Sequence, residues 1–122
     1  MTTQSLHEER TRILHEMSSI DQMIRGHVSS QTYQVQRAGQ TVTQGPYYVL
    51  QRHQDGRNLS TRINEQEVEL ISRHVLAYKR YMALAERYAA LSEQLTWQQQ
   101  DATVKKKFRR FWPAISPKRP AS

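Results

Sequence analysis

Residues 64–98, NEQEVELISRHVLAYKRYMALAERYAALSEQLTWQ, hold the longest sustained hydrophobic periodicity of the chain. Asn64 is followed three positions later by Glu67, a capping-box spacing that supplies partners to the first backbone N–H groups of a helix. Apolar residues then recur at alternating steps of three and four, which keeps their side chains on one helix face. The stretch therefore predicts a helix from Asn64 to about Gln98, which would span roughly 50 Å.

Two adjacent apolar seams run along this predicted helix, and together they are too wide for one helical partner. A chain of 122 residues cannot easily cover both seams along that length. We therefore expect coiled-coil character, with a second copy of the chain or a larger protein partner burying the remainder. The predicted partner interface consists of Val68, Ile71, Val75, Tyr78, Tyr81, Met82, Leu84, Tyr88, Leu91 and Leu95.

An N-terminal helix is predicted by a second capping-box spacing, Ser5 with Glu8, followed by a narrow apolar stripe. The stripe continues to Ile24, so the helix is expected to run to about Arg25. Gly26 is placed to end it, because Gly adopts a left-handed C-terminal turn without steric cost. We expect the stripe to pack on the long helix.

The residues between the two helices predict a small antiparallel sheet. Alternation predicts a strand over 27–37, and small polar residues predict a loop over 38–44. Residues 46–53 form the stronger strand pattern, and they lead into Asp55–Gly56, a typical type I′ turn pair, and then into 58–63. The predicted fold is α+β, with an N-terminal helix, a sheet of about three strands with a hairpin, and one long C-terminal helix.

Composition sets limits on compartment and chemistry. No apolar run approaches the roughly 20 residues needed to span a bilayer, and the polar start of the chain does not resemble a secretory signal. We expect a cytoplasmic protein. The absence of Cys excludes disulfides, thiolate nucleophiles and cysteine metal sites.

The net charge of +7 is confined to the end of the chain. Residues 1–101 contain 11 Lys and Arg and 11 Asp and Glu, whereas residues 102–122 contain seven Lys and Arg and no acid. Such an asymmetric block is typical of an interaction tail. We therefore divide the chain into one domain over residues 1–100 and a disordered, basic and aromatic tail over residues 101–122.

The tail carries the strongest functional signal, an alternation of cations and aromatic rings. Its residues are Lys105, Lys106, Lys107, Phe108, Arg109, Arg110, Phe111 and Trp112. The cations would neutralise phosphates and the rings would stack on unpaired bases, which favours RNA or single-stranded DNA. The alternatives are an anionic membrane surface, a groove on a larger protein, or a solubilising tail whose rings fold back on the body.

A second candidate nucleic-acid site lies on or near the hairpin, where Arg52, Arg57 and Arg62 cluster. A β-ribbon bearing Arg can enter a major groove, and Arg52 and Arg62 share one face in some strand registers. The competing interpretation is solvation, or pairing with a carboxylate such as Glu65. The tyrosines, Tyr47 and Tyr48 among them, would either form a base-stacking platform or pack in the core.

Signals for catalysis and metal binding are lacking. The sequence contains no glycine-rich phosphate loop, GxSxG, HExxH or close pair of acids, and its five histidines do not have metal-ligand spacing. We expect no enzyme, no cofactor and no metal.

The sequence resembles a family of small, uncharacterised prokaryotic proteins. The resemblance covers roughly residues 24–92 and rests on GPYYVL at 45–50, the hairpin pair Asp55–Gly56, and the stretch from Tyr78 to Tyr81. The family pattern has a GPYYYL strand, a Gly-Lys hairpin, a Tyr-x-Pro-Lys-Glu helix start and an Asn-Tyr-Arg-Arg-Phe helix. Its members often carry a cysteine cluster just before GPYY, which this chain lacks. The resemblance implies a fold and no activity.

Two functional hypotheses follow from these patterns. The first is a non-enzymatic accessory protein that binds DNA or RNA beside a larger nucleic-acid enzyme or assembly. In outline, a hairpin followed by a helix is also similar to the arm-type DNA-binding domains of integrases. The second is a helical adaptor that binds a protein through the long helix and the aromatic tail.

Overall fold

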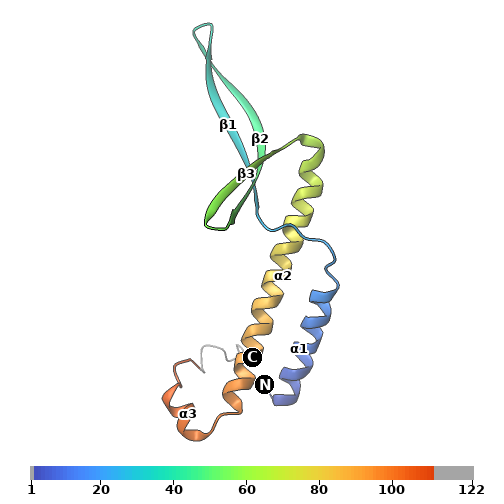
Figure 1. Cartoon of the computed structure of the whole chain (residues 1–122), viewed down its shortest axis with the longest axis vertical. Coiled ribbons are helices and arrows are strands. Elements are labelled where there is room, and N and C mark those ends of the chain that lie inside the picture. Colours follow the sequence, from blue (N-terminus) through green and yellow to red (C-terminus); the bar gives the residue numbers. More distant parts are fainter. Residues whose placement is uncertain (1, 112–122) are drawn as a thin grey trace, which may run out of the picture. The chain divides into compact units, whose positions relative to one another are not determined.

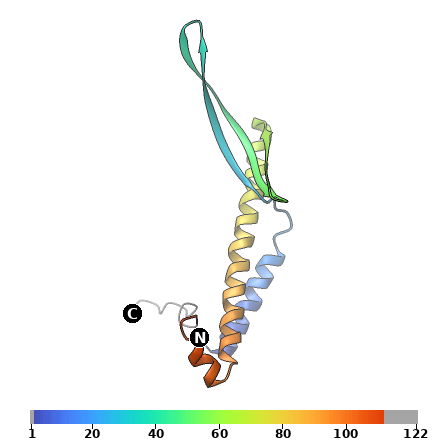
Figure 2. The same ribbon diagram turned by 60° about the vertical axis from the view of Figure 1, so that its left-hand side comes forward.

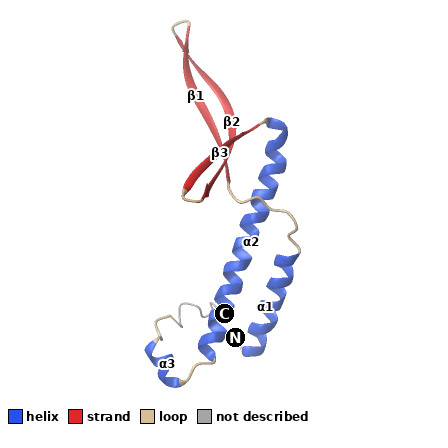
Figure 3. Cartoon of the chain, viewed as in Figure 1, coloured by secondary structure: helices blue, strands red, loops and turns tan. Residues whose placement is uncertain are grey.

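The structure is a computed structural model that describes residues 2–111. Its elements in chain order are α1 (Thr3–Ser18), β1 (His27–Arg37), β2 (Gln40–Gln54), β3 (Arg57–Ile63), α2 (Glu65–Gln98) and α3 (Ala102–Lys107) (Figures 1 and 3). The strands form one antiparallel sheet in the order β1-β2-β3. The predicted α+β class, with an N-terminal helix, a three-stranded sheet and a long helix, is confirmed.

The long helix begins where the capping box predicts. The side-chain oxygen of Asn64 accepts a hydrogen bond from the backbone N–H of Glu67 at 3.1 Å. The Glu67 carboxylate accepts one from the backbone N–H of Asn64 at 3.2 Å. Two N–H groups that α2 itself cannot satisfy therefore have partners, and the helix continues for 34 residues to Gln98.

Replacing Asn64 with Ala is expected to lower the free energy of unfolding by about 1 kcal/mol, because the Glu67 N–H then loses its side-chain acceptor and keeps only the Asn64 carbonyl oxygen, at 3.0 Å. Urea unfolding followed by far-UV circular dichroism would measure the loss. Gln66→Ala, an exposed change in the same first turn, is the control and should have little effect. Equal losses in both variants would contradict the capping role.

The N-terminal helix differs from its prediction at both ends. Thr2, not Ser5, is the N-cap, and its side chain accepts from the Ser5 N–H at 3.1 Å. The helix ends at Ser18 instead of Arg25. The following segment bonds elsewhere, since the Ile24 N–H donates to the His74 carbonyl of α2 at 3.0 Å.

The described residues form two compact units, one of residues 2–21 with 81–111 and the other of Gln22–Arg80. We call them the helical unit and the sheet unit. The predicted boundary near residue 101 stays a prediction.

In the helical unit, α1 packs antiparallel to the second half of α2, and the two helices lie side by side in both views of the ribbon (Figures 1 and 2). Glu9 forms an ion pair with Arg87 at 2.8 Å, and Arg10 donates to the Ser92 hydroxyl at 3.1 Å. The core of the unit consists of Leu6, Ile13, Leu91 and Leu95, with Met17, Leu84 and Tyr88 packed against it.

In the sheet unit, β1 and β2 meet in a two-residue turn at Ala38–Gly39, because Arg37 pairs with Gln40. The predicted loop over 38–44 is therefore wrong from Gln40 onward. The β-branched residues of 41–43 favour an extended strand, and Val42 lies directly opposite Val35 of β1. The second hairpin turn, Asp55–Gly56, has the positive φ angles of 53° and 74° that its type I′ prediction requires.

The register of β1 and β2 shifts next to Gly45. Gln31 pairs with Tyr47 and Tyr33 pairs with Gln44, so Gly45 and Pro46 together oppose the single residue between Gln31 and Tyr33. This is a β-bulge, and it requires glycine. Gly45 has φ of +113°, and a Cβ atom there would lie 2.8 Å from the Gln31 carbonyl oxygen.

The start of the tail is also ordered, contrary to the prediction of a wholly disordered segment. The side chain of Asp101 accepts from the Val104 N–H at 3.0 Å and begins α3. This local cap makes residues 102–107 helical. Trp112 and the residues predicted to be disordered beyond it lie outside the described part of the chain.

Candidate functional site

Five cations gather in α3 and the turn that follows it. Lys105, Lys106 and Lys107 occupy the last turn of α3, where the partial negative charge of a helix C-terminus favours cations. Arg109 and Arg110 follow directly. We call these five residues, with Phe108 and Phe111, the basic cluster. Lys105 is half-buried, and the other four cations are exposed.

An aromatic ring of the basic cluster packs against Trp97 near the end of α2. Phe108 lies 5.3 Å from Trp97 between ring centroids, and Phe111 lies 6.2 Å from Phe108. Phe108 is half-buried by this arrangement, whereas Phe111 remains 48% exposed. Trp97 is not among the site residues predicted from the sequence, although its place at the end of the long helix, close to an aromatic tail, was a usable signal.

The predicted hairpin arginines do not share one face. Arg52 pairs with Leu59 across β2 and β3, whereas Arg62 pairs with Val49. Because side chains alternate between faces along a strand, Arg52 and Arg57 lie on one face and Arg62 lies on the other. A common face for Arg52 and Arg62 is therefore wrong.

Arg52 already has an intramolecular partner. Its Nε and Nη2 donate to the carbonyl oxygen of Arg25 at 3.1 Å and 2.8 Å. These two bonds attach the segment before β1 to β2. A side chain held in this way is not directed outward for reading a DNA groove.

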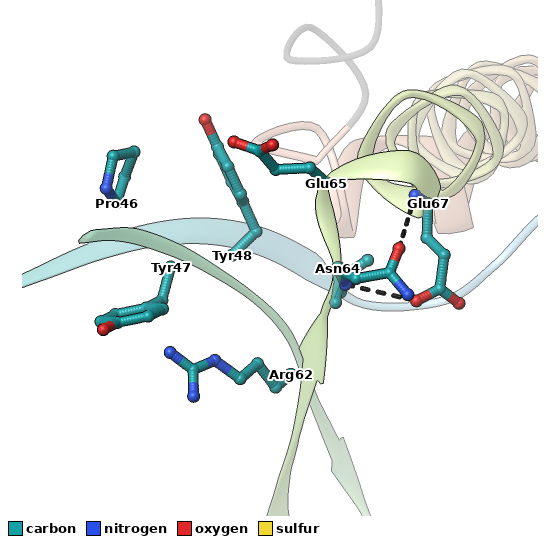
Figure 4. A pocket seen from close by; sticks show the side chains of 8 residues that line it. Pro46, Tyr47, Tyr48, Arg62, Asn64, Glu65 and Glu67 are labelled. Atoms are coloured by element: carbon teal, nitrogen blue, oxygen red, sulfur yellow. Dashed lines mark hydrogen bonds between the residues drawn. The ribbon is translucent and has the colours of Figure 1, made fainter.

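Arg62 stacks on a tyrosine. Its guanidinium carbon lies 3.6 Å from the ring centroid of Tyr47, and Tyr33 lies 5.7 Å from Tyr47 on the same face. Figure 4 shows Tyr47 and Arg62 on one side of the strands, with Tyr48 and Glu65 on the other. The described structure gives Arg62 no ion pair with Glu65, the competing interpretation of this arginine.

Two hollows adjoin this stack. One, of about 300 Å³, is lined by Gln31, Tyr33, Tyr47, Val49, Ser60 and Arg62. The other, of about 540 Å³, is lined by Pro46, Tyr47, Tyr48, Arg62, Ile63, Asn64, Glu65 and Glu67 (Figure 4). The smaller hollow has no carboxylate in its lining, so it offers an aromatic and cationic surface with two polar side chains.

The residues of the predicted partner interface on α2 differ in how far the chain itself buries them. Leu91 and Leu95 are buried against α1, with Leu84 and Tyr88 packed beside them, so α1 of the same chain already covers this part. Val75 is buried in the sheet unit, and Met82 is exposed. The remaining predicted residues, Val68, Ile71, Tyr78 and Tyr81, are half-buried.

Residues 2–111 lack two further features, a membrane-spanning helix and a metal-binding cluster. Within residues 2–111, no helix has the length and apolar character needed to cross a membrane. The same residues hold no group of three or more His, Asp or Glu side chains placed to bind a metal ion. In comparisons with protein-family models, curated proteins and solved structures, the chain has no match.

Proposed function

We propose that the protein is a non-enzymatic accessory protein that binds nucleic acid through the basic cluster, beside a larger nucleic-acid enzyme or assembly in the cytoplasm. The observation that carries the proposal is the exposure of Lys106, Lys107, Arg109 and Arg110 in a segment without acids. Adjacent cations of this kind release counterions from a phosphate backbone, which supplies affinity without base recognition.

The limited exposure of the aromatic rings in the described cluster favours nucleic acid over a membrane surface as the ligand. Peripheral membrane binding requires a broad apolar face to enter the lipid, in addition to cations. Phe108 packs beside Trp97, which leaves Phe111 as the one exposed aromatic side chain of the described cluster. Among residues 105–111 the chain therefore offers one ring to a ligand, which suffices to stack on one base.

A salt titration of binding tests the proposal. Full-length protein and a fluorescein-labelled single-stranded oligonucleotide would be compared by anisotropy from roughly 50 to 300 mM KCl. In K106Q/K107Q, two phosphate contacts are lost, so the slope of log K against log salt should become shallower by about 1.4. Relative to equal affinity at about 1 M salt, this slope change lowers the affinity about 25-fold at 0.1 M KCl.

The matched control is R12Q/K79Q, which removes the same charge from two exposed positions outside the cluster. Its slope should stay that of the wild type. Equal effects of the two double variants would assign binding to net charge alone. Binding that is insensitive to salt would exclude phosphate contacts and overturn the proposal.

A second candidate function is a protein adaptor, and exposed leucines of α2 favour it. Leu70 is 51% exposed and Leu76 is 63% exposed. Six residues place these leucines about 120° apart around the helix, so only a homodimer or a larger protein partner with a broad contact would remove both side chains from water. Such a complex should be stable at salt concentrations that dissociate nucleic acid, and L70S/L76S should weaken it.

A further inference from the structure

The sheet presents one face that its own unit leaves open. Alternation along β1, β2 and β3 places Gln31, Tyr33, Tyr47, Val49, Ser60 and Arg62 on this face. None of these six side chains is buried, and none is acidic. By contrast, the opposite face includes Ile63, which is buried. We call the first of these surfaces the open face.

The open face holds a positively charged side chain that is already held in position, and an exposed aromatic ring. The guanidinium carbon of Arg62 lies over the Tyr47 ring, 3.6 Å from its centroid, so the guanidinium is already positioned before any ligand arrives. Tyr33 is 51% exposed, and its hydroxyl donates to the side-chain oxygen of Gln31 at 2.8 Å. That bond fixes the tyrosine ring and leaves the amide N–H₂ group of Gln31 available.

We propose that the open face binds an unpaired base of single-stranded nucleic acid, with Tyr33 as the stacking ring and Arg62 as the phosphate contact. Tyr47 is a positioning residue, because it holds the guanidinium of Arg62. Gln31 and Ser60, which line the same hollow of about 300 Å³, would bond the edge of the base. This inference rests on the proposed function and names its substrate as a single strand.

Two observations favour a single strand over a duplex. In a duplex the faces of the bases are covered by their neighbours, so an exposed tyrosine ring has nothing to stack on. Reading a major groove would instead require several outward side chains on one face of the ribbon. Arg52 is bound to the Arg25 carbonyl, and Arg57 lies on the face opposite Arg62.

Tyr33→Leu and Arg62→Lys test the inference, since the first keeps an apolar side chain without the ring and the second keeps the charge without the planar guanidinium. Arg57→Lys, on the same strand but the opposite face, is the matched control. Full-length variants would be titrated with a fluorescein-labelled oligothymidine or oligouridine and with a duplex of equal length. Circular dichroism would verify that each variant is folded.

We expect Y33L to weaken single-strand binding about 5- to 100-fold, because stacking on one base is lost. The salt slope should stay unchanged, in contrast to K106Q/K107Q, since no charge is removed. R62K should weaken single-strand binding less, and R57K should not weaken it. Duplex affinity should be the same in all three variants.

Two results would overturn the inference while leaving the proposed function intact. The first is wild-type affinity of Y33L and R62K when K106Q/K107Q is weakened. The second is an equal loss of duplex and single-strand binding in Y33L, which would assign the effect to phosphates or folding. If the wild-type protein binds neither oligonucleotide, the proposed function itself fails, and this inference fails with it.

Discussion

Replacing Leu91 with Ala is expected to lower the free energy of unfolding by about 2 to 5 kcal/mol, which is a large part of the stability of a small protein. Leu91 is 1% exposed and packs with Leu6, Ile13 and Leu95 between α1 and α2. The substitution removes three carbons, the Cγ methine and two methyl groups, and leaves a cavity that two helices can close only in part.

The measurement is urea unfolding followed by circular dichroism at 222 nm. Leu14→Ala is the matched control, since it makes the same chemical change on α1 at a side chain that is 51% exposed. Leu and Ala have similar helix propensities, so the difference between the two variants isolates burial. A loss in L14A as large as that in L91A would contradict the packing of α1 on α2.

Gly45→Ala is expected to destabilise the sheet unit by about 2 to 5 kcal/mol, because two unfavourable effects add. The backbone of Gly45 has φ of +113°, where other residues are strained, and its new Cβ would lie 2.8 Å from the Gln31 carbonyl oxygen. The bulge would have to shift to relieve the contact. Tyr47, two residues later, would then lose its position beneath Arg62.

The measurement is native-state hydrogen exchange of the β1 and β2 amides. It gives the free energy of opening of this region separately from that of the helical unit. Gly39→Ala is the control. It also places Ala at a positive φ, +77°, but nothing lies within 4 Å of its Cβ. It should cost about 1 kcal/mol. Protection that falls equally in both variants would show that steric contact at Gly45 is unimportant.

The features predicted correctly are those set by residues close together in sequence. Asn64 and Glu67 define the start of α2 without help from the rest of the fold. Asp55–Gly56 likewise fixes its own hairpin through the φ angles that the turn requires. The end of α1 escaped prediction because Ile24 bonds to His74, a partner that only the folded sheet unit supplies.

The candidate sites depend more strongly on distant residues. A register shift of one residue moves every side chain of a strand to the other face. The sequence alone therefore does not decide whether Arg52 and Arg62 lie on the same face. The pairing of Arg62 with Val49 decides the question. The ring contact between Tyr33 and Tyr47 could not be predicted from the sequence for a related reason. The Gly45 bulge sets the offset between their two strands.

One edge of β2 has no neighbour along part of its length. β3 pairs with residues 48–54 of β2, whereas residues 40–44 and Tyr47 of β2 pair with β1 alone (Figure 3). Alternate N–H and C=O groups of that segment therefore face away from the sheet, and a second extended chain could add there as a further strand. Pro46 limits such an addition, since it contributes no N–H at the point where β3 ends. An added strand would therefore lack one backbone hydrogen bond at Pro46.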